Sequence, residues 1–319
     1  MVGEFEFIDN LRSKYGLKMI GDDCAVLPKD ARTDLLLTAD MLVENVDFRL
    51  EWIPPELLGH KALAISLSDI AAMGGQPVWA MLSIGIPKSL WKGDFADRFY
   101  EGWFKLAKEI RVDLVGGDVS RSPDRLVIDS IVGGEIGKGT AILRSSAKIG
   151  DLIVVTGDLG GAAAGLQLLQ TARFDETKGD DWQKILSLKH LKPTPQLATA
   201  TYLHSNDLAT SMIDISDGLS SDLGHICKGS SVGATIYAES IPLNPYLTHI
   251  APSMDHQLDL ALNGGEDFEL LFTADPKKIS QLDDREFSVI GEVTETIGII
   301  KLMRAGNASV LAPKGYRHF

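Results

Sequence analysis

Short apolar, β-prone runs alternate with helix-like segments along the whole chain, and this alternation is the feature that most limits its fold. The strand-like runs of the first half are 34–40, 78–86, 112–115 and 126–132. Between them, residues 54–73 and 95–109 have apolar side chains at helical spacing. Glycines are expected to end the first helix at 74–75 and to break the last strand at 133–139. The pattern predicts an α/β or α+β protein.

The second half of the chain restarts the same pattern. Strands are expected at 151–156, 212–215 and 268–273. A glycine-rich turn at 157–161 opens a helix that reaches about Gln170, and another helix is expected at 219–228.

The length of the chain and the point where the strand–helix pattern begins again together predict two domains. The chain has 319 residues, and domains usually have roughly 100–200. We place the boundary in 147–150, so that residues 1–147 form an N-terminal domain and residues 148–319 form a C-terminal domain.

The chain is acidic, with 31 lysines and arginines against 44 aspartates and glutamates and a net charge of −13. This charge argues against binding to nucleic-acid backbones or to anionic membranes, both of which attract clustered Lys and Arg. The acidic residues 1–7 are unlike a signal peptide, and no run approaches the ~18 apolar residues of a membrane span. Two cysteines cannot form a disulfide framework. A cytoplasmic protein is therefore expected.

Carboxylates gather at five predicted turns or strand ends, most of them beside glycine. The five segments are 21–23, 37–40, 116–118, 213–218 and 264–267. In α/β sheets, ligands bind beyond the carboxyl ends of strands, where glycine lets the backbone approach a ligand closely. Asp and Gly also favour turns for conformational reasons alone, so each segment by itself is open to that simpler interpretation. Five such segments in one chain weaken the interpretation that they are only ordinary turns.

Asp69 falls within the apolar stripe of the helix predicted at 54–73. The stripe consists of Leu58, Ala62, Ile65, Asp69 and Ala72. A carboxylate that faces the interior requires a cation, a hydrogen-bond partner or a shifted pKa. A salt bridge or a cap on a neighbouring element would satisfy it, and so would a metal ion. Oxygen ligands without His or Cys suit Mg²⁺, Mn²⁺ or Ca²⁺ and not zinc.

The known phosphate-binding motifs are absent or incomplete in the sequence. Residues 133–140 resemble a P-loop but are one residue short between the glycines and lead into a β-like segment. Residues 157–161 fail the pattern Gly-x-Gly-x-x-Gly, although free N–H groups at the start of their helix would suit a phosphate. Arg144 is either a phosphate partner or an ordinary surface arginine. Acid clusters that hold several divalent ions, which in turn hold phosphates, would support phosphoryl transfer.

Seven segments occur together in an order that resembles the thiamine-monophosphate kinase family. They are Gly3-Glu-Phe5, Gly21-Asp-Asp-Cys-Ala25, residues 61–74 (KALAISLSDIAAMG), Gly116-Gly-Asp118, Ile213-Asp-Ile-Ser-Asp-Gly218, Gly264-Gly-Glu-Asp267 and Lys314-Gly-Tyr-Arg-His-Phe319. The resemblance covers essentially the whole chain, and 67–74 and 214–218 are its most specific segments. That family belongs to the aminoimidazole-ribotide-synthetase-like superfamily, which uses ATP without a P-loop.

The resemblance implies a two-domain α/β (α+β) fold, with a mixed sheet and helices in the N-terminal domain. It implies the ATP-dependent phosphorylation of thiamine monophosphate to thiamine diphosphate, the last step of thiamine diphosphate biosynthesis. Direct in-line transfer is expected without a side-chain nucleophile or base, because a phosphate oxygen is already ionised near neutral pH. The implied cofactors are several Mg²⁺ ions, with a monovalent cation as a further candidate. The implied partners are ATP, thiamine monophosphate and a second copy bound through the N-terminal sheet.

Matching the chain to the family residue by residue assigns three sets of site residues. The implied metal ligands are Asp23, Thr38, Ala39, Asp40, Asp69, Asp118, Asp214 and Asp217. Ala39 offers only its main-chain carbonyl. The implied ATP contacts are Tyr100, Gly117, Asp118, Arg144 and Ser216. The implied substrate contacts are Asp47, Glu266 and Tyr316, the last because Pro313 stands where the family often has Trp.

Two alternatives remain open at the level of sequence. The nearest is another enzyme of the superfamily, namely the purine-pathway cyclase, selenophosphate synthetase or the hydrogenase-maturation dehydratase. Selenophosphate synthetase would show a reactive N-terminal Cys, and the maturation enzyme would end in Cys where this sequence has Phe319. The second alternative is a non-catalytic protein that binds several cations, which would take up Mg²⁺ without retaining ATP or releasing ADP.

Overall fold

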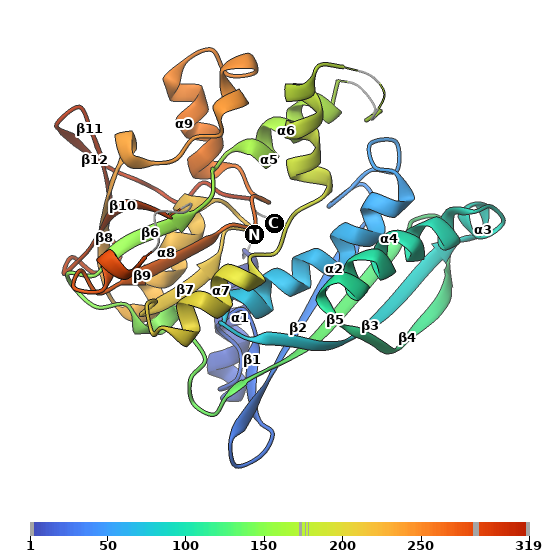
Figure 1. Cartoon of the computed structure of the whole chain (residues 1–319), viewed down its shortest axis with the longest axis horizontal. Coiled ribbons are helices and arrows are strands. Elements are labelled where there is room, and N and C mark those ends of the chain that lie inside the picture. The colour runs from blue at the N-terminus through green and yellow to red at the C-terminus, as the bar shows by residue number, and fades with distance from the viewer. Residues whose placement is uncertain (1–2, 172–173, 176, 178, 283–286, 317–319) are drawn as a thin grey trace.

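The computed structural model describes residues 3–171, 174–175, 177, 179–282 and 287–316 (Figure 1). Its strands form two sheets, one from each half of the chain, and helices pack against both. This arrangement confirms the predicted α/β (α+β) class. Within the described residues, no helix is both long enough and apolar enough to cross a membrane.

The N-terminal sheet has five strands in the order β1-β2-β5-β3-β4. They are β1 (Ala25–Pro28), β2 (Thr33–Val43), β3 (Gln76–Pro87), β4 (Asp113–Ser122) and β5 (Val127–Gly137). Neighbours are antiparallel except β3 and β4. Because parallel strands need a crossover connection, the chain between them forms two helices, α3 (Lys88–Trp91) and α4 (Phe95–Ile110).

Helix α2 (Pro55–Ala72) lies beside α4 on one face of this sheet (Figure 1). Two glycines allow the helices to touch through their backbones. A Cβ at Gly59 would lie 1.9 Å from the Phe99 carbonyl oxygen, and one at Gly102 would lie 1.8 Å from that of Glu56. The helix begins after Pro54 and ends before the glycine pair, as the sequence predicted.

The opposite face of the N-terminal sheet carries exposed apolar side chains. On β2, Leu36 and Leu42 point to the buried face of the sheet. Met41 points to the opposite face and is 61% exposed. Met81 on β3 is exposed as well. Apolar side chains grouped on an open sheet face are typical of an interaction surface.

The C-terminal sheet has seven strands in the order β12-β11-β8-β10-β6-β9-β7. They are β6 (Leu152–Thr156), β7 (Ser211–Asp214), β8 (Gly233–Tyr237), β9 (Leu270–Ala274), β10 (Phe287–Thr294), β11 (Ile300–Arg304) and β12 (Asn307–Val310). Its helices are α5 (Gly161–Leu169), α6 (Asp181–Leu191), α7 (Leu197–Ser205), α8 (Leu219–Ser230) and α9 (Met254–Asn263). Most pairs are antiparallel, and only β8 and β11 among them run parallel.

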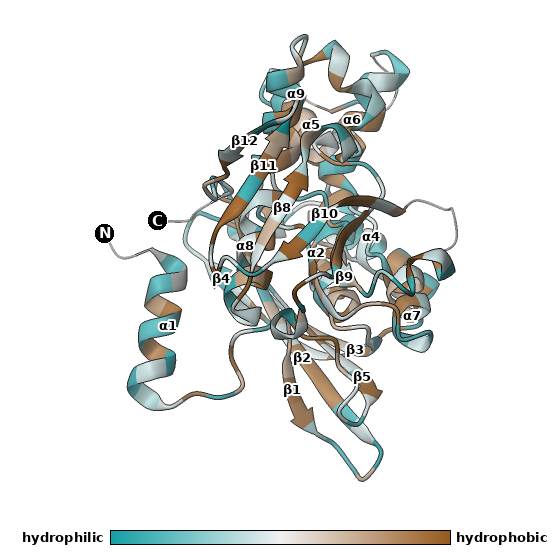
Figure 2. Ribbon diagram, turned by 90° about the vertical axis from the view of Figure 1, so that its left-hand side faces the viewer, coloured by the Kyte–Doolittle hydropathy of each residue, from teal (hydrophilic) through white to brown (hydrophobic). Residues whose placement is uncertain are grey.

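Helix α2 also contacts β7 and α7 of the C-terminal half. Ala71 and Ala72 belong to the same buried core as Met212 and Phe272. Burial from both sides explains why α2 is apolar nearly all round. By contrast, α1 (Glu4–Tyr15) stands at the side of the molecule (Figure 2) and is tied to α8 by an ion pair of Asp9 with Lys228 at 2.5 Å.

Three segments differ from the expectation, and two of them contain glycine. The strand expected to break at 133–139 continues to Gly137. Residue 133 is glycine for packing, because a Cβ there would lie only 2.2 Å from the Trp79 indole of the neighbouring strand. Residues 116–118 lie inside β4, and Asp40 lies inside β2, so the expected position at turns or strand ends is wrong for both carboxylates. Here glycine serves close packing within a sheet and not a turn.

Candidate active site

Three aspartates from distant parts of the chain meet where the two halves join. Asp23 precedes β1, Asp69 lies near the end of α2, and Asp214 is the last residue of β7. One carboxylate oxygen of each lies within 4.8 Å of those of the other two. Asp23 and Asp214 are buried, while Asp69 keeps partial exposure. Grouped carboxylate oxygens of this kind are the ligands that Mg²⁺ prefers.

Two residues of β2 extend this carboxylate cluster. Asp40 Oδ2 accepts a hydrogen bond from Ser66 Oγ of α2 at 2.7 Å, and the Thr38 hydroxyl donates to Asp69 Oδ2. Thr38 and Asp40 are two residues apart, so they share the face of β2 that packs against α2. Ala39 lies on the other face and is exposed.

Burial and mutual repulsion shift the pKa values of the cluster. Burial, followed by the charges of Asp129 and Asp23, raises the pKa of Asp40 to about 6. Burial and the charge of Asp23 raise the pKa of Asp214 to about 7. The pKa of Asp69 is raised well above its ordinary value by burial, then by Asp40 and Asp214. A bound cation would reverse these shifts, because it stabilises the ionised carboxylates.

One oxygen of Asp214 shows that the cluster fits a metal ion. Among the described residues, Asp214 Oδ2 and Ser68 Oγ on α2 are both buried without a hydrogen bond of good geometry, although the Ser68 hydroxyl lies close enough to Asp214 to act to lower its pKa. A buried carboxylate oxygen without a partner carries a large desolvation cost. An oxygen-ligated divalent cation would remove that cost, so the residues present fit Mg²⁺.

Arg144 places a positively charged side chain beside the carboxylate cluster. It begins the short turn η1 (Arg144–Ser146) that connects the two halves, and its side chain is 20% exposed. Its guanidinium grips both oxygens of Asp23, with Nη2 2.6 Å from Oδ1 and Nε 3.1 Å from Oδ2. Burial acts to lower the pKa of Arg144, but the charge of Asp23 and its hydrogen bonds outweigh burial and raise it. The expected phosphate partner therefore lies beside the expected metal ligands.

Asp217 belongs to a second group of potential ligands at the start of α8. Asp217, Asp222 and His225 each place one ligand atom within 4.8 Å of the other two. Asp222 accepts N–H groups of Asp217 and Gly218 at 3.2 and 3.0 Å, which ties the turn to the helix. Sequence reasoning missed Asp222 and His225. Their i, i+3 spacing on a predicted helix was the available signal.

The three expected substrate residues are neighbours. The N–H of Tyr316 donates to the Asp217 carbonyl oxygen at 3.1 Å, which holds the C-terminal tail against the start of α8. Burial, followed by the charges of Asp47 and Glu266, raises the pKa of Tyr316. Asp47 follows β2, and its Oδ2 accepts the Val43 N–H at 2.8 Å.

Glu266 has two cationic or polar partners that sequence reasoning missed. Lys61 Nζ of α2 and His190 Nδ1 of α6 lie 2.9 and 2.8 Å from its Oε2. Its own N–H donates to the Ser216 carbonyl oxygen at 2.8 Å, so the expected ATP residue Ser216 lies next to the substrate residues. Nothing local in the sequence links these residues, since they belong to separate elements.

Gly117 and Asp118 lie at a distance from the carboxylate cluster. Both are on β4, the edge strand, which β3 and β5 separate from β2. The strand register pairs Asp118 with Ser83, Ser83 with Asp129, and Asp129 with Met41, so these side chains share one face of the sheet. Asp40 is next to Met41 in β2 and therefore points to the opposite face. Within a single chain, Asp118 thus lies apart from the other expected ligands.

Tyr100 lines an apolar cavity at the edge of the N-terminal sheet, together with residues of α4, β3 and β4. This cavity shares Ile86, Trp91 and Val119 with a neighbouring one of about 200 Å³, whose lining includes Arg121. The cavity that Tyr100 itself lines has only about 20 Å³ of free volume, which is room for a water-sized group and not for an aromatic base.

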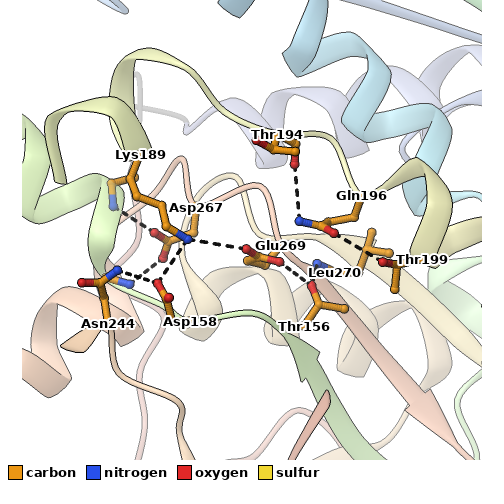
Figure 3. Close-up of polar contacts among 12 residues, drawn as sticks. Thr156, Asp158, Lys189, Thr194, Gln196, Thr199, Asn244, Asp267, Glu269 and Leu270 are labelled. Carbon is orange, nitrogen blue, oxygen red and sulfur yellow. Dashed lines mark hydrogen bonds and ion pairs between the residues drawn. The ribbon is translucent and has the colours of Figure 1, made fainter. Parts of the chain in front are cut away.

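The start of α5 differs from the expected phosphate cradle. The N–H groups of Gly160 and Ala162 donate to the two oxygens of Asp267, at 2.7 and 3.0 Å (Figure 3). The expectation of free N–H groups is wrong for these two, because a carboxylate of the chain already occupies the positive end of the helix.

Comparison with known families identifies the class of protein. Residues 21–136 match the family described as "AIR synthase related protein, N-terminal domain", and residues 148–301 match "AIR synthase related protein, C-terminal domain". The chain is thus an AIR synthase related protein, with one matched domain in each half.

Individual relatives narrow this class. The chain is 39% identical to thiamine-monophosphate kinase of Buchnera aphidicola subsp. Schizaphis graminum, over 99% of this chain and 98% of that protein. Identity to the Bacillus subtilis enzyme is 36%, with 94% and 93% covered. The solved structure of AaThiL complexed with AMPPCP and TMP has a TM-score of 0.88 at 32% identity, with 100% and 97% covered. The chain belongs to the thiamine-monophosphate kinase family, which confirms the resemblance.

Proposed function

We propose that this chain transfers the γ-phosphoryl group of ATP to thiamine monophosphate and so forms thiamine diphosphate. Family membership supports this kinase activity, and AaThiL was solved with the ATP analogue AMPPCP and with TMP. The observation that carries the proposal is the cluster of Asp23, Asp69 and Asp214, which is assembled from both halves and leaves one buried oxygen unpartnered among the described residues. A kinase without a P-loop requires such a cation site to hold phosphates.

Several Mg²⁺ ions are proposed to bind at this joint. Asp23, Asp40, Asp69 and Asp214 would hold the first ions, with Thr38, the Ala39 carbonyl and Asp217 as further ligands. Asp118 also belongs to the proposed set, although a single chain does not bring it to this joint. Because Mg²⁺ usually takes only one or two carboxylates, this many acids imply more than one ion. The bound ions supply neutralisation of the charge on the two phosphate groups.

The proposed ATP contacts are Tyr100, Gly117, Asp118, Arg144 and Ser216. Arg144 adjoins the carboxylate cluster through Asp23, and its planar fork is suited to phosphate oxygens. Tyr100 is proposed from its match to the family alone, because the cavity that it lines, of about 20 Å³, is too small for the base. Gly117 is proposed from its match to the family, since the Leu82 carbonyl oxygen occupies the space that a side chain of Gly117 would need.

The proposed contacts to thiamine monophosphate are Asp47, Glu266 and Tyr316. Two carboxylates beside an aromatic ring suit a cationic aromatic ligand such as the thiazolium of thiamine. Tyr316 is 47% exposed, so part of this residue is accessible to solvent.

The transfer requires no side-chain nucleophile or base. A terminal phosphate oxygen of the substrate attacks the γ-phosphorus of ATP, and as this bond forms the bond to the β-phosphate oxygen breaks and ADP leaves. Cys24, close to the cluster, is no alternative nucleophile, because burial and the charges of Asp69 and Asp23 raise its pKa well above the ordinary value. The residues of the chain therefore act by binding and aligning two anions.

We also propose a homodimer formed through the exposed face of the N-terminal sheet, with domains at 1–147 and 148–319. The N-terminal domain would dimerise and bind ATP and Mg²⁺, and the C-terminal domain would complete the site. The exposed side chains of Met41 and Met81 support the dimer. The two buried free thiols, Cys24 and Cys227, suit a reducing compartment such as the cytoplasm.

The proposed activity is tested by ³¹P NMR of the protein with ATP, Mg²⁺ and thiamine monophosphate. Thiamine diphosphate and ADP are expected to appear in equal amounts, and chelation of Mg²⁺ is expected to stop both. ADP with free phosphate would point instead to another member of the superfamily. Mg²⁺ binding without any ADP would support the non-catalytic alternative. Repeating the assay with and without K⁺ tests the monovalent cation.

A further inference from the structure

Lys61, His190 and Glu266 form a buried polar junction between the two halves of the chain. Lys61 Nζ donates to Glu266 Oε2 at 2.9 Å and to the His190 carbonyl oxygen at 3.1 Å. His190 Nδ1 lies 2.8 Å from the same Oε2. The side chains of Lys61 and His190 are only 1% and 6% exposed. A lysine so deeply buried on a core helix requires a specific reason.

The two contacts leave one side of Glu266 available. Both engage Oε2, and the Glu266 side chain is 28% exposed, so Oε1 is the oxygen open to a ligand. Burial alone would raise the pKa of Glu266, but the charge of Lys61 and the contacts with His190 outweigh it and lower the pKa to about 2. Glu266 is therefore ionised at neutral pH.

The backbone around Glu266 is fixed from two directions. Glu266 has φ +67°, a left-handed conformation that is strained for a residue with a side chain. On one side its N–H is bound to the Ser216 carbonyl oxygen. On the other side Asp267 caps the start of α5.

Two successive residues of α6, Lys189 and His190, contact acidic residues in and around the segment that contains Glu266. His190 contacts Glu266, and Lys189 lies 3.2 Å from Asp158 and 3.9 Å from Glu269, between the two acids (Figure 3). With the backbone held in this way, the remaining freedom of Glu266 is rotation of its side chain. Two donors that converge on one oxygen remove that freedom as well.

We propose that Lys61 and His190 are positioning residues that orient Glu266 so that Oε1 binds the thiamine moiety of the substrate. Lys61 comes from the N-terminal half, whereas His190 and Glu266 come from the C-terminal half. Recognition of the substrate therefore depends on the correct contact between the halves, which also assembles the carboxylate cluster. This inference rests on the proposed function.

A double-mutant cycle distinguishes positioning from a merely structural ion pair. Lys61→Met is expected to raise KM for thiamine monophosphate about tenfold, with kcat and KM for ATP within about threefold of wild type. Glu266→Gln is expected to raise the same KM at least as much. If Lys61 acts through Glu266, the double variant resembles Glu266→Gln alone. Lys192→Met, which removes an exposed lysine at the end of α6, is the matched control and is expected to change none of these values.

Substitution of His190 gives an independent test should Lys61→Met fail to fold. His190→Asn can place an amide N–H near the position of Nδ1 and is expected to keep KM for thiamine monophosphate within about threefold. His190→Leu cannot donate and is expected to raise it about tenfold. Far-UV circular dichroism and thermal unfolding would establish that each variant is folded.

Several outcomes would overturn the inference. Multiplicative effects in the double variant, equal increases in the KM for ATP, or equal behaviour of His190→Asn and His190→Leu would each show a structural role only. These results would leave the proposed function intact, since they require an active wild type. A wild-type protein that forms no thiamine diphosphate would instead refute the proposed function.

Discussion

Asp214 is the buried side chain through which the proposed metal binding would be coupled to stability. Its pKa is raised to about 7, chiefly by burial and then by Asp23, and its Oδ2 is unpartnered among the described residues. Each of these features is unfavourable for an ionised carboxylate in a metal-free protein. The same features are favourable once a cation is bound, because the oxygen is already in place and need not be desolvated.

The first prediction concerns the conversion of this carboxylate to an amide. Asp214→Asn is expected to lower thiamine diphosphate formation at saturating Mg²⁺ by at least about 100-fold, because a metal ligand contributes several kcal/mol to catalysis. The free energy of unfolding is expected to change little or to rise, because one of several mutually repelling charges is removed. Asp69→Asn should behave alike. The exposed Asp124→Asn is the control, and equal turnover in wild type and Asp214→Asn would refute the metal-ligand role.

The second prediction concerns the pH dependence of stability without metal. Since the folded pKa of Asp214, about 7, lies above the ordinary value of 3.8, proton binding stabilises the folded chain. That stabilisation is complete below about pH 4 and is lost as the pH rises through about 7. The unfolding free energy of wild type relative to Asp214→Asn should therefore fall over this range in EDTA, as measured by urea unfolding. Mg²⁺ is expected to reverse the fall at neutral pH, and a difference that stays flat would contradict the assignment.

At the scale of elements, α2 is the helix on which the site depends. It carries Asp69 and Ser66 toward the carboxylate cluster and Lys61 toward Glu266. Its position is set by close backbone contact with α4, which the absence of a side chain at Gly102 permits.

The third prediction tests this packing with two Gly→Ala changes. Gly102→Ala is expected to destabilise the protein by about 3 kcal/mol, because its Cβ would lie 1.8 Å from a backbone oxygen that cannot move aside. Gly224→Ala, also within a helix, meets only Pro313 at 3.6 Å. It should be neutral or stabilise by about 0.5–1 kcal/mol through helix propensity. Chemical denaturation of both variants checks the contrast, and similar effects of the two substitutions would show that the helix contact is not tight.

At the scale of the whole molecule, one apolar face is left without cover. The outward row of the N-terminal sheet includes Met41 and also Asp118, which the single chain does not bring to the carboxylate cluster. Shielding of this face by a second copy would remove the exposed apolar surface from water.

The fourth prediction is that charges on this face prevent self-association. Wild type is expected to be a dimer by light scattering, and Met41→Lys combined with Met81→Lys is expected to be a folded monomer. Val310→Lys alters an equally exposed apolar residue on β12 and should leave the dimer unchanged. A monomeric wild type, or a dimeric double variant, would exclude association through this sheet.

Most of the element pattern was accessible from the sequence. Helix α2 was predicted within a residue or two of its limits, because proline and glycine mark its ends and apolar periodicity marks its length. The interior of the N-terminal sheet was harder to predict. Gly133 and Gly117 resemble turn residues, yet each lies within a strand. Glycine is needed there because a tryptophan ring or a backbone oxygen of the neighbouring strand occupies the space of a side chain.

The sequence by itself determined the fold class, the family and the acids most suited to ligate metal, because these follow from local periodicity and from motifs read in order. The tertiary structure alone decided which of these residues meet. It brings Asp23, Asp69 and Asp214 together, directs Asp118 to the other face of its sheet, and pairs Glu266 with two residues that no motif had marked. The physical reason is that such contacts join elements far apart in the chain. Their geometry is set by how two sheets pack around α2, and no local pattern records that packing.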